Sequence, residues 1–229
     1  MIRLKAAGVL AAILWIVFGI TLVIRLMAGD GGLLAGEMLR AAPPEETGLP
    51  EKDYPGVGEM TADYLAGRTE TFQYVIPEGE GAGTACFHDY EAAHMADCRG
   101  LIRLDTVVCM ICAAAAAALT AAGLAGRRGL EGFLRGILWG LRAAGLLACA
   151  LGIWALADFN GLFVTFHRAA FSNDGWLLNP KTDLLIRLMP TRFFTRLGII
   201  GLLRTLAVPA VLEAGARFGL HMLKKEGKQ

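Results

Sequence analysis

Four long runs of apolar residues limit what this chain can fold into. A helix needs about 20 mostly apolar residues to cross the roughly 30 Å hydrocarbon core of a bilayer. Four segments approach or exceed that length, namely 6–24, 106–126, 137–157 and 197–212. The first two contain no charged residue, whereas the third and fourth carry Arg142 and Arg204. The chain is also 55% hydrophobic, which is more apolar than an ordinary soluble domain.

These runs predict a mainly α, polytopic membrane protein with four transmembrane helices. With their flanks, the predicted helices cover residues 6–27, 105–126, 137–157 and 197–216. A cleaved signal peptide is the alternative for the first run, but the apolar region of such peptides usually spans about 7–15 residues. The first run is longer, which favours a retained helix. Arg142 and Arg204 should face protein, water or a headgroup, and Glu213 is a candidate partner.

The distribution of charge predicts the orientation of the helices. Lys and Arg near the ends of membrane helices are retained in the cytoplasm. They occur at the N-terminus, in the short loop 127–136 and in the tail 217–229. In segment 28–104, by contrast, acidic residues outnumber basic ones by 14 to 5. We therefore expect a cell-membrane protein with both termini in the cytoplasm and with 28–104 and 158–196 outside.

The larger outer segment is expected to form a small extracytoplasmic cap. Residues 28–50 are rich in Gly and Pro and predict a surface loop. A short helix is expected at 61–66, and the alternating residues of 69–76 predict an edge strand or a short β hairpin. A helical pattern then starts at Asp89 and leads into the second run. Because the cap is acidic, nucleic-acid binding is not expected. Nucleotide binding is not expected either, because the sequence contains no glycine-rich phosphate-binding loop.

One face of the helix that starts at Asp89 is titratable. Residues three or four apart are neighbours on a helix, so His94 lies on one face with Glu91 and with Asp97 or Cys98. We expect a flanking carboxylate to orient one ring nitrogen of His94 and to leave the other free, which is what a general base needs.

The second outer loop brings another histidine to the same side of the membrane. Phe159, Phe163 and Phe166 share one helical face, and His167 follows them directly. Asn173 and Asp174 then start a turn beside this aromatic stripe. An interfacial anchor belt with a snorkelling histidine is the alternative. His221 is expected at the cytoplasmic end of the protein, far from His94 and His167, and is interpreted as part of the tail.

Two other functions stay open at this point. A metal-dependent membrane hydrolase would use Cys86, His88, His94 and Cys98, although their spacing is not a standard zinc pattern and no His-Glu-x-x-His motif occurs. A non-enzymatic membrane protein with a partner-binding cap is the other alternative. A serine hydrolase is not expected, because no Gly-x-Ser-x-Gly elbow is present.

At the two histidine segments the chain resembles the bacterial lipoprotein intramolecular transacylase family, known as Lit. The resemblance spans most of the chain and rests on motifs in the expected order. These are Tyr64-Leu65-x-Gly67, Glu91-x-x-His94-Met95-x-Asp97, Phe166-His167, Phe171-x-Asn173-Asp174-x-Trp176, Pro180, Asp183 and Pro190-x-x-Phe193-Phe194. His88 falls outside these motifs. Cys98 stands where the family pattern leads us to expect an aliphatic residue.

The resemblance implies an acyltransferase of the bacterial plasma membrane that needs no cofactor and no metal. Its substrates would be lipoproteins with a diacylglyceryl group on the N-terminal cysteine, met in the lipid of the membrane. The acyl chain would move from the glyceryl sn-2 oxygen to the cysteine's own amino group. His94 and His167 match the catalytic histidines; we assign His94 as base and His167 as stabiliser, with the reverse left open. The predicted substrate contacts are Glu91, Asp97, Phe166, Phe171, Asn173, Asp174 and Trp176.

Overall fold

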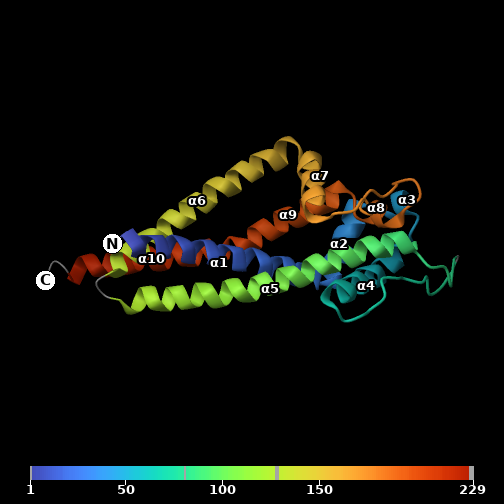
Figure 1. Cartoon of the computed structure of the whole chain (residues 1–229). Coiled ribbons are helices and arrows are strands. Elements are labelled where there is room, and N and C mark those ends of the chain that lie inside the picture. The colour runs from blue at the N-terminus through green and yellow to red at the C-terminus, as the bar shows by residue number, and fades with distance from the viewer. Residues whose placement is uncertain (1, 80, 127–128, 227–229) are drawn as a thin grey trace. The chain divides into compact units, whose positions relative to one another are not determined.

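Helices make up most of the chain in the computed structural model (Figure 1), which describes residues 2–79, 81–126 and 129–226. The order of elements is α1 (Ile2–Ala28), α2 (Gly31–Ala41), α3 (Pro44–Thr47), η1 (Glu51–Asp53), α4 (Tyr54–Ala66), α5 (Asp89–Ala125), α6 (Leu130–Ala157), α7 (Phe159–Ala170), α8 (Leu184–Leu188), α9 (Thr191–Thr205) and α10 (Ala207–Glu226). The prediction of a mainly α protein is confirmed.

Four of the helical segments are long and apolar enough to cross a membrane. They are Leu4–Ala28, Asp89–Ala125, Leu130–Ala157 and Thr191–Glu226. The first half of α5 is rich in charged residues, whereas its second half carries the second apolar run. The fourth segment is not one helix, because α9 ends at Thr205 and α10 starts at Ala207. Pro209 explains this break, since it has no N–H to donate to the carbonyl of Thr205.

The chain forms two compact units. Unit 1 comprises Met1–Val23, Thr106–Leu156 and Leu202–Gln229, and unit 2 comprises Ile24–Asp105 and Ala157–Gly201. In unit 1, α1 and α6 approach each other at their backbones. A Cβ atom added to Gly8 would lie 2.1 Å from the carbonyl oxygen of Phe133, and one added to Gly136 would lie 2.1 Å from that of Lys5. Small residues permit such close packing of membrane helices.

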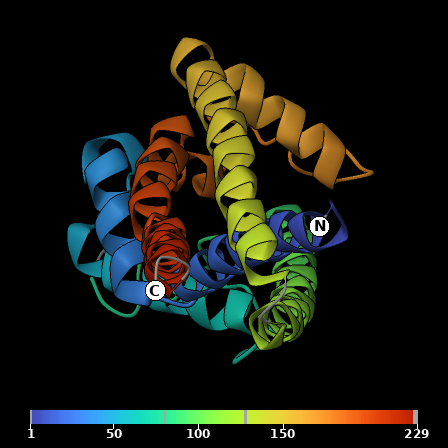
Figure 2. The same cartoon turned by 90° about the vertical axis from the view of Figure 1, so that its left-hand side faces the viewer.

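Three helix ends of unit 1 lie together. Leu4 at the start of α1 reaches Gly129 just before α6, and Leu134 early in α6 reaches Gly219 on α10. Figure 2 shows this end of unit 1, where the first turns of α1 and α6 and the last turns of α10 gather. That the basic segments share one side of the membrane stays a prediction. Arg127, Arg128 and Lys228, which are part of that prediction, lie outside the described residues.

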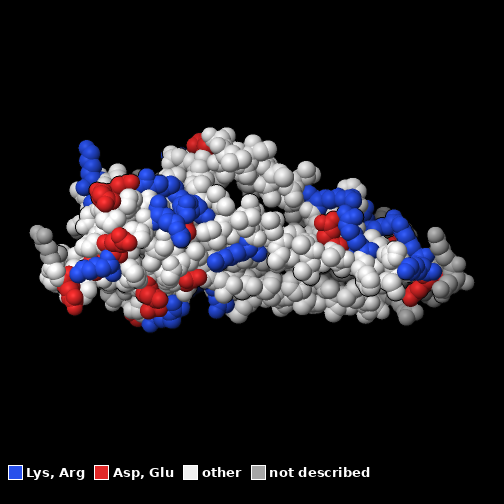
Figure 3. All heavy atoms as spheres, turned by 180° about the vertical axis from the view of Figure 1, so that it is seen from behind, with Lys and Arg blue, Asp and Glu red and all other residues white. Residues whose placement is uncertain are grey.

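Charged side chains in unit 1 pair differently from the sequence-based expectation. Arg217 donates to Glu213 through Nε and Nη2, at 2.9 and 2.6 Å. Arg142 lies 5.2 Å over the ring of Trp139. Glu213 therefore pairs with Arg217 on its own helix rather than with Arg142 or Arg204. On the face seen in Figure 3, much of the surface of unit 1 is uncharged, whereas acidic and basic side chains lie side by side in unit 2.

Helices replace the predicted surface loop at the start of unit 2. The carboxylate of Asp30 accepts the amide of Leu33 at 2.9 Å and caps α2. Leu34, Met38 and Ala41 repeat at helical spacing and are buried. α2 packs against α4, and a Cβ added to Gly58 would lie 2.5 Å from a carbonyl oxygen of α2. The prediction of a loop over 28–50 is wrong because buried apolar spacing outweighs the content of turn residues.

The predicted β hairpin is not confirmed, because the described residues contain no β-strand. Val75 and Ala85 form one isolated antiparallel bridge. Three glycines between them, Gly79, Gly81 and Gly83, have positive φ angles, which glycine adopts readily, and lie in the turn that joins the two segments. The short helix expected at 61–66 is present but starts earlier, as α4, and ends at Ala66, before Gly67 with φ 78°.

A buried carboxylate links the helices of unit 2. Glu37 on α2 is only 2% exposed and accepts from Arg196 on α9 and from Arg40, the latter at 2.6 Å. Arg192 on α9 also donates to the carbonyl of Ala41. Two arginines of α9 thus hold the end of α2, beside a core formed by Tyr54, Val57, Leu188 and Phe193 among others.

Candidate active site

His94 is a buried residue on the first part of α5. Its side chain is 9% exposed, and its Nε2 atom lies 3.6 Å from Sγ of Cys98, one turn later. Within the described residues, Nδ1 is buried without a hydrogen-bond partner. The expectation that a flanking carboxylate orients this ring is therefore wrong, since Cys98 occupies the position beside Nε2.

His167 lies on α7 and is 7% exposed. Its Nδ1 atom is 2.8 Å from the carbonyl oxygen of Phe163, one turn earlier. A carbonyl can only accept, so Nδ1 must carry the proton of this bond. In the neutral ring the Nε2 atom then keeps its lone pair and can accept a proton. Sequence reasoning placed Phe163 on an aromatic stripe but missed this role, although the spacing of four residues on a helix was available.

The structure brings the two histidines together within unit 2. Their ring centroids lie 6.2 Å apart. Phe171 touches both rings, with centroids 5.2 Å from His94 and 5.5 Å from His167. Trp176 lies 5.1 Å from His167, and Phe166 lies 5.4 Å from it at a right angle. Three of the aromatic residues predicted as substrate contacts thus surround the pair.

Burial sets the protonation of both histidines. It lowers the pKa of His94, as does the neighbouring His167, whereas Asp97 opposes the shift. Burial likewise lowers the pKa of His167, against the effect of the Phe163 carbonyl. Because the usual value is about 6.5, both rings are mainly neutral at pH 7. Neutral histidines can accept or donate a hydrogen bond, as acyl transfer requires.

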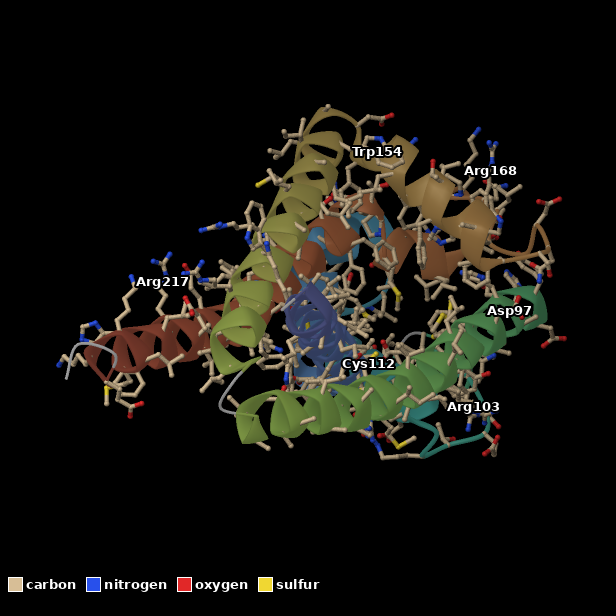
Figure 4. The ribbon with its side chains drawn as sticks, turned by 60° about the vertical axis from the view of Figure 1, so that its left-hand side comes forward. Asp97, Arg103, Cys112, Trp154, Arg168 and Arg217 are labelled. Atoms are coloured by element: carbon tan, nitrogen blue, oxygen red, sulfur yellow. The ribbon has the colours of Figure 1, made fainter. Side chains whose placement is uncertain are left out.

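A hydrogen bond ties the loop after α7 to α5. Nδ2 of Asn173 donates to Oδ2 of Asp97 at 2.9 Å, and Oδ1 of Asn173 accepts the amide of Gly175. Figure 4 shows Asp97 on α5 and Arg168 on α7, with Arg168 directed away from α5.

The loop after α7 also forms a pocket of about 250 Å³, lined by Arg168, Phe171, Ser172, Asn173, Asp174, Trp176 and Leu177.

Glu91 has a different environment from the one expected. It is fully buried, and its two oxygens accept the backbone amides of His88 and Leu185, both at 2.8 Å. One residue earlier, the hydroxyl of Tyr90 donates to Asp183 at 2.7 Å. Glu91 and Tyr90 thus fix the start of α8 to the start of α5. Tyr90 was missed by sequence reasoning, because nothing local marks a partner so distant in sequence. A substrate contact by Glu91 stays a prediction.

The residues of the alternative metal site do not form a cluster. No group of three or more His, Cys, Asp or Glu side chains in the described part of the chain could hold a metal ion. His88 instead stacks on Tyr90, with ring centroids 5.2 Å apart.

Comparison with known proteins identifies the family. The family model of the lipoprotein intramolecular transacylase Lit matches residues 9–194, which include both histidine segments. The chain belongs to the Lit family. The resemblance inferred from the sequence motifs is confirmed. The chain is therefore an acyltransferase that carries out intramolecular transacylation of lipoproteins, as predicted.

Solved structures share the fold of this Lit-family protein. One is the membrane-integral lipoprotein intramolecular transacylase Lit from Bacillus cereus, at 20% identity and a TM-score of 0.74, with 100% of this chain and 99% of that chain covered. Two more carry an arginine or an alanine in place of one histidine, at 21% identity and TM-scores of 0.68 and 0.66. These two matches cover 95% and 96% of the solved chains and 100% of this chain. No curated protein matched the sequence.

Proposed function

We propose that His94 and His167 together catalyse the transfer of an acyl chain from the sn-2 oxygen of an S-diacylglyceryl cysteine to its α-amino group. The product would be an N-acyl, S-monoacylglyceryl lipoprotein. The observation that carries the proposal is the pair of neutral, buried rings 6.2 Å apart with Phe171 against both. A reacting carbon between them would be within reach of one nitrogen from each ring.

His167 is the better candidate for the base. Its Nδ1 proton is held by the Phe163 carbonyl, which leaves Nε2 as the acceptor. This is the reverse of the assignment made from the sequence, which gave the base role to His94. His94 then serves as the hydrogen-bond donor to the oxyanion. Removing one such donor typically costs about 3–4 kcal/mol of transition-state stabilisation.

The steps balance without an enzyme nucleophile. The free amine attacks the sn-2 ester carbonyl, a C–N bond forms, and Nε2 of His167 takes a proton from the attacking nitrogen. The carbonyl oxygen becomes an oxyanion that accepts a hydrogen bond from His94. When the intermediate collapses, the C–O bond breaks and His167 returns the proton to the glyceryl oxygen. The ester becomes an amide and a hydroxyl, so no cofactor is consumed.

The surrounding residues would bring the amine and the ester together. The apolar surface formed by Phe166, Phe171 and Trp176 would hold the diacylglyceryl group in a folded conformation. This conformation would place the amine next to the ester carbonyl and so favour the reaction by proximity. Asp97 and Asn173 would hold the polar end of the substrate, with Asp174 at the mouth of the pocket. Glu91 acts by fixing α8 rather than by reaching the substrate in this proposal.

The proposed topology follows the charge distribution. The cap 28–104 and the loop 158–196 lie outside the cell membrane, with both termini in the cytoplasm. The site is then at the outer surface of the bilayer, where a lipoprotein substrate keeps its acyl chains in lipid.

Lipopeptide mass spectrometry in a bacterial host that makes diacylglyceryl lipoproteins tests the proposal. We expect H94A and H167A each to abolish the N-acyl, monoacylglyceryl product while the protein inserts normally. H221A, on α10, is the matched control and should retain activity. Full activity of either site variant would remove that residue from the catalytic pair. Unmodified lipoproteins with the wild-type chain would favour the partner-binding alternative, and stoichiometric zinc in purified enzyme would favour the hydrolase.

A further inference from the structure

Cys98 is the contact of Nε2 of His94. The other ring nitrogen, Nδ1, has no hydrogen-bond partner among the described residues. Sγ lies 3.6 Å from Nε2, within the range of a hydrogen bond that involves sulfur. The two residues are one turn apart on α5, so the helix itself sets this distance. Sequence reasoning noted Cys98 only as a departure from the family pattern and as a candidate metal ligand.

Chemistry indicates which atom donates. A neutral imidazole nitrogen with a lone pair is a good acceptor, whereas a thiol sulfur is a weak one. Burial, followed by the nearby charge of Asp97, raises the pKa of the Cys98 thiol to about 12. The thiol therefore keeps its proton at pH 7 and has it available to donate.

We propose that Cys98 is a positioning residue whose S–H donates to Nε2 of His94 and so keeps the proton of that ring on Nδ1. This inference rests on the proposed function, and it assigns complementary tautomers to the two histidines. His167 offers a bare Nε2 as base, and His94 offers an N–H as donor. The Nδ1 atom of His94 is buried without a partner in the described residues. An unpaired buried N–H is unfavourable, and the developing oxyanion would supply the missing acceptor.

Few other groups act on this ring. The titratable residues around it are Asp97 and Cys98 on its own helix and His167 on α7. Phe171 contributes only an aromatic face. Cys98 is therefore the side chain able to select between the two nitrogens of His94.

Two variants separate a hydrogen-bonding role from a packing role. C98S keeps a donor at the same position, while C98V fills the space without one. We expect C98V to lower kcat about 5- to 10-fold, the typical effect of one lost hydrogen bond, with KM nearly unchanged. C98S should stay within about threefold of the wild type. Thermal unfolding of both variants checks that they fold.

Nitrogen-15 NMR of histidine-labelled enzyme in detergent reads the tautomer directly, with H94Q to assign the His94 signals. We expect a proton on Nδ1 of His94 in the wild type and in C98S, and a shift towards the Nε2-protonated form in C98V. A wild-type proton on Nε2, or a folded C98V with wild-type kcat and tautomer, would overturn the role of Cys98. Such a result would leave the proposed function intact if H94A and H167A are inactive. Activity in those two variants would instead refute the proposed function itself.

Discussion

The rings of His94 and His167 lie 6.2 Å apart, although they come from two helices that are distant in the sequence. This separation is too wide for a hydrogen bond between the rings and suits two nitrogens that approach one reacting centre from different sides. Each ring has a neighbour on its own helix one turn away, Cys98 for His94 and Phe163 for His167. Both rings are buried, and the tautomers proposed for them differ.

The pH dependence of the reaction should report the lowered pKa of the base. Below its pKa, His167 is protonated and cannot accept a proton from the amine. Because burial lowers the pKa of His167 below its usual value of 6.5, activity should persist to lower pH than for an exposed histidine. A free α-amino group has a pKa of about 8. We expect log(kcat/KM) for a lipopeptide to rise with a slope of one from the histidine pKa to about pH 8.

Below that histidine pKa the slope should steepen to two, because both substrate and base are then protonated. The measurement uses purified enzyme in detergent with mass-spectrometric detection of product. A change from slope two to slope one above pH 6.5 would contradict the direction of the shift.

The bond between Asn173 and Asp97 should control how well the loop after α7 is placed. N173A removes the donor that ties this loop to α5. A hydrogen bond to a charged group contributes about 1.5–3 kcal/mol when shielded, and this one is exposed, so we expect a smaller loss of about 2- to 5-fold in kcat/KM. S172A changes the neighbouring residue of the same pocket and should be nearly neutral. Equal effects of the two substitutions would argue against the tie.

Replacing Glu91 with glutamine should lower the free energy of unfolding, because the side chain loses one of its two backbone amide bonds. In E91Q, one carboxylate oxygen becomes an NH₂ group, which cannot accept the amide of His88 or Leu185. A buried N–H without an acceptor costs about 1–3 kcal/mol. We expect a lower thermal midpoint in detergent and reduced activity, since α8 loses its attachment. E78Q, at an exposed glutamate, is the control, and a similar midpoint for both variants would contradict the prediction.

The helical framework was predictable because length and hydropathy decide it. Residues 6–24, 106–126 and 137–157 are too apolar and too long for a soluble loop, and all of them except Gly126 lie in helices. The proximity of the two histidines had a different signal in the sequence. His94 precedes the second apolar run and His167 follows the third beside aromatic residues, and the structure places their rings 6.2 Å apart.

Tertiary contacts decided the rest. Helix α2 depends on burial of Met38 and Glu37 against other elements, which composition does not reveal. The partners of Glu91 are backbone amides, one of them far along the chain, which its spacing from His94 could not reveal. The tautomer of His167 follows from a backbone carbonyl, which no side-chain motif records.

Glu37 should make unit 2 sensitive to acid. Burial alone would raise the pKa of this carboxyl, but Arg196 and Arg40 outweigh burial and lower the pKa below 4.5. A carboxyl with a lowered pKa stabilises the fold above its unfolded-state pKa, and this stabilisation disappears as pH falls through the folded-state value. We expect E37Q to have a lower thermal midpoint than the wild type at pH 7, with a difference that shrinks below about pH 4.5. E45Q, at an exposed glutamate, should show no such difference, and a gap for E37Q that is constant with pH would contradict this account.

Two glycines on α6 offer a matched test of the packing of unit 1. At Gly136 an added Cβ would lie 2.1 Å from the carbonyl oxygen of Lys5 and 3.0 Å from Cα of Gly8. At Gly145 no heavy atom of the described residues lies within 4 Å of the added atom. Overpacking usually costs about 1–3 kcal/mol, and here the neighbour is backbone, which cannot rotate away. We expect G136A to lower the thermal midpoint in detergent clearly. G145A should be neutral or slightly stabilising, since alanine favours a helix by up to about 1 kcal/mol over glycine. Because both substitutions add one methyl group to the same helix, equal midpoints for the two variants would mean that α1 and α6 do not meet at Gly136.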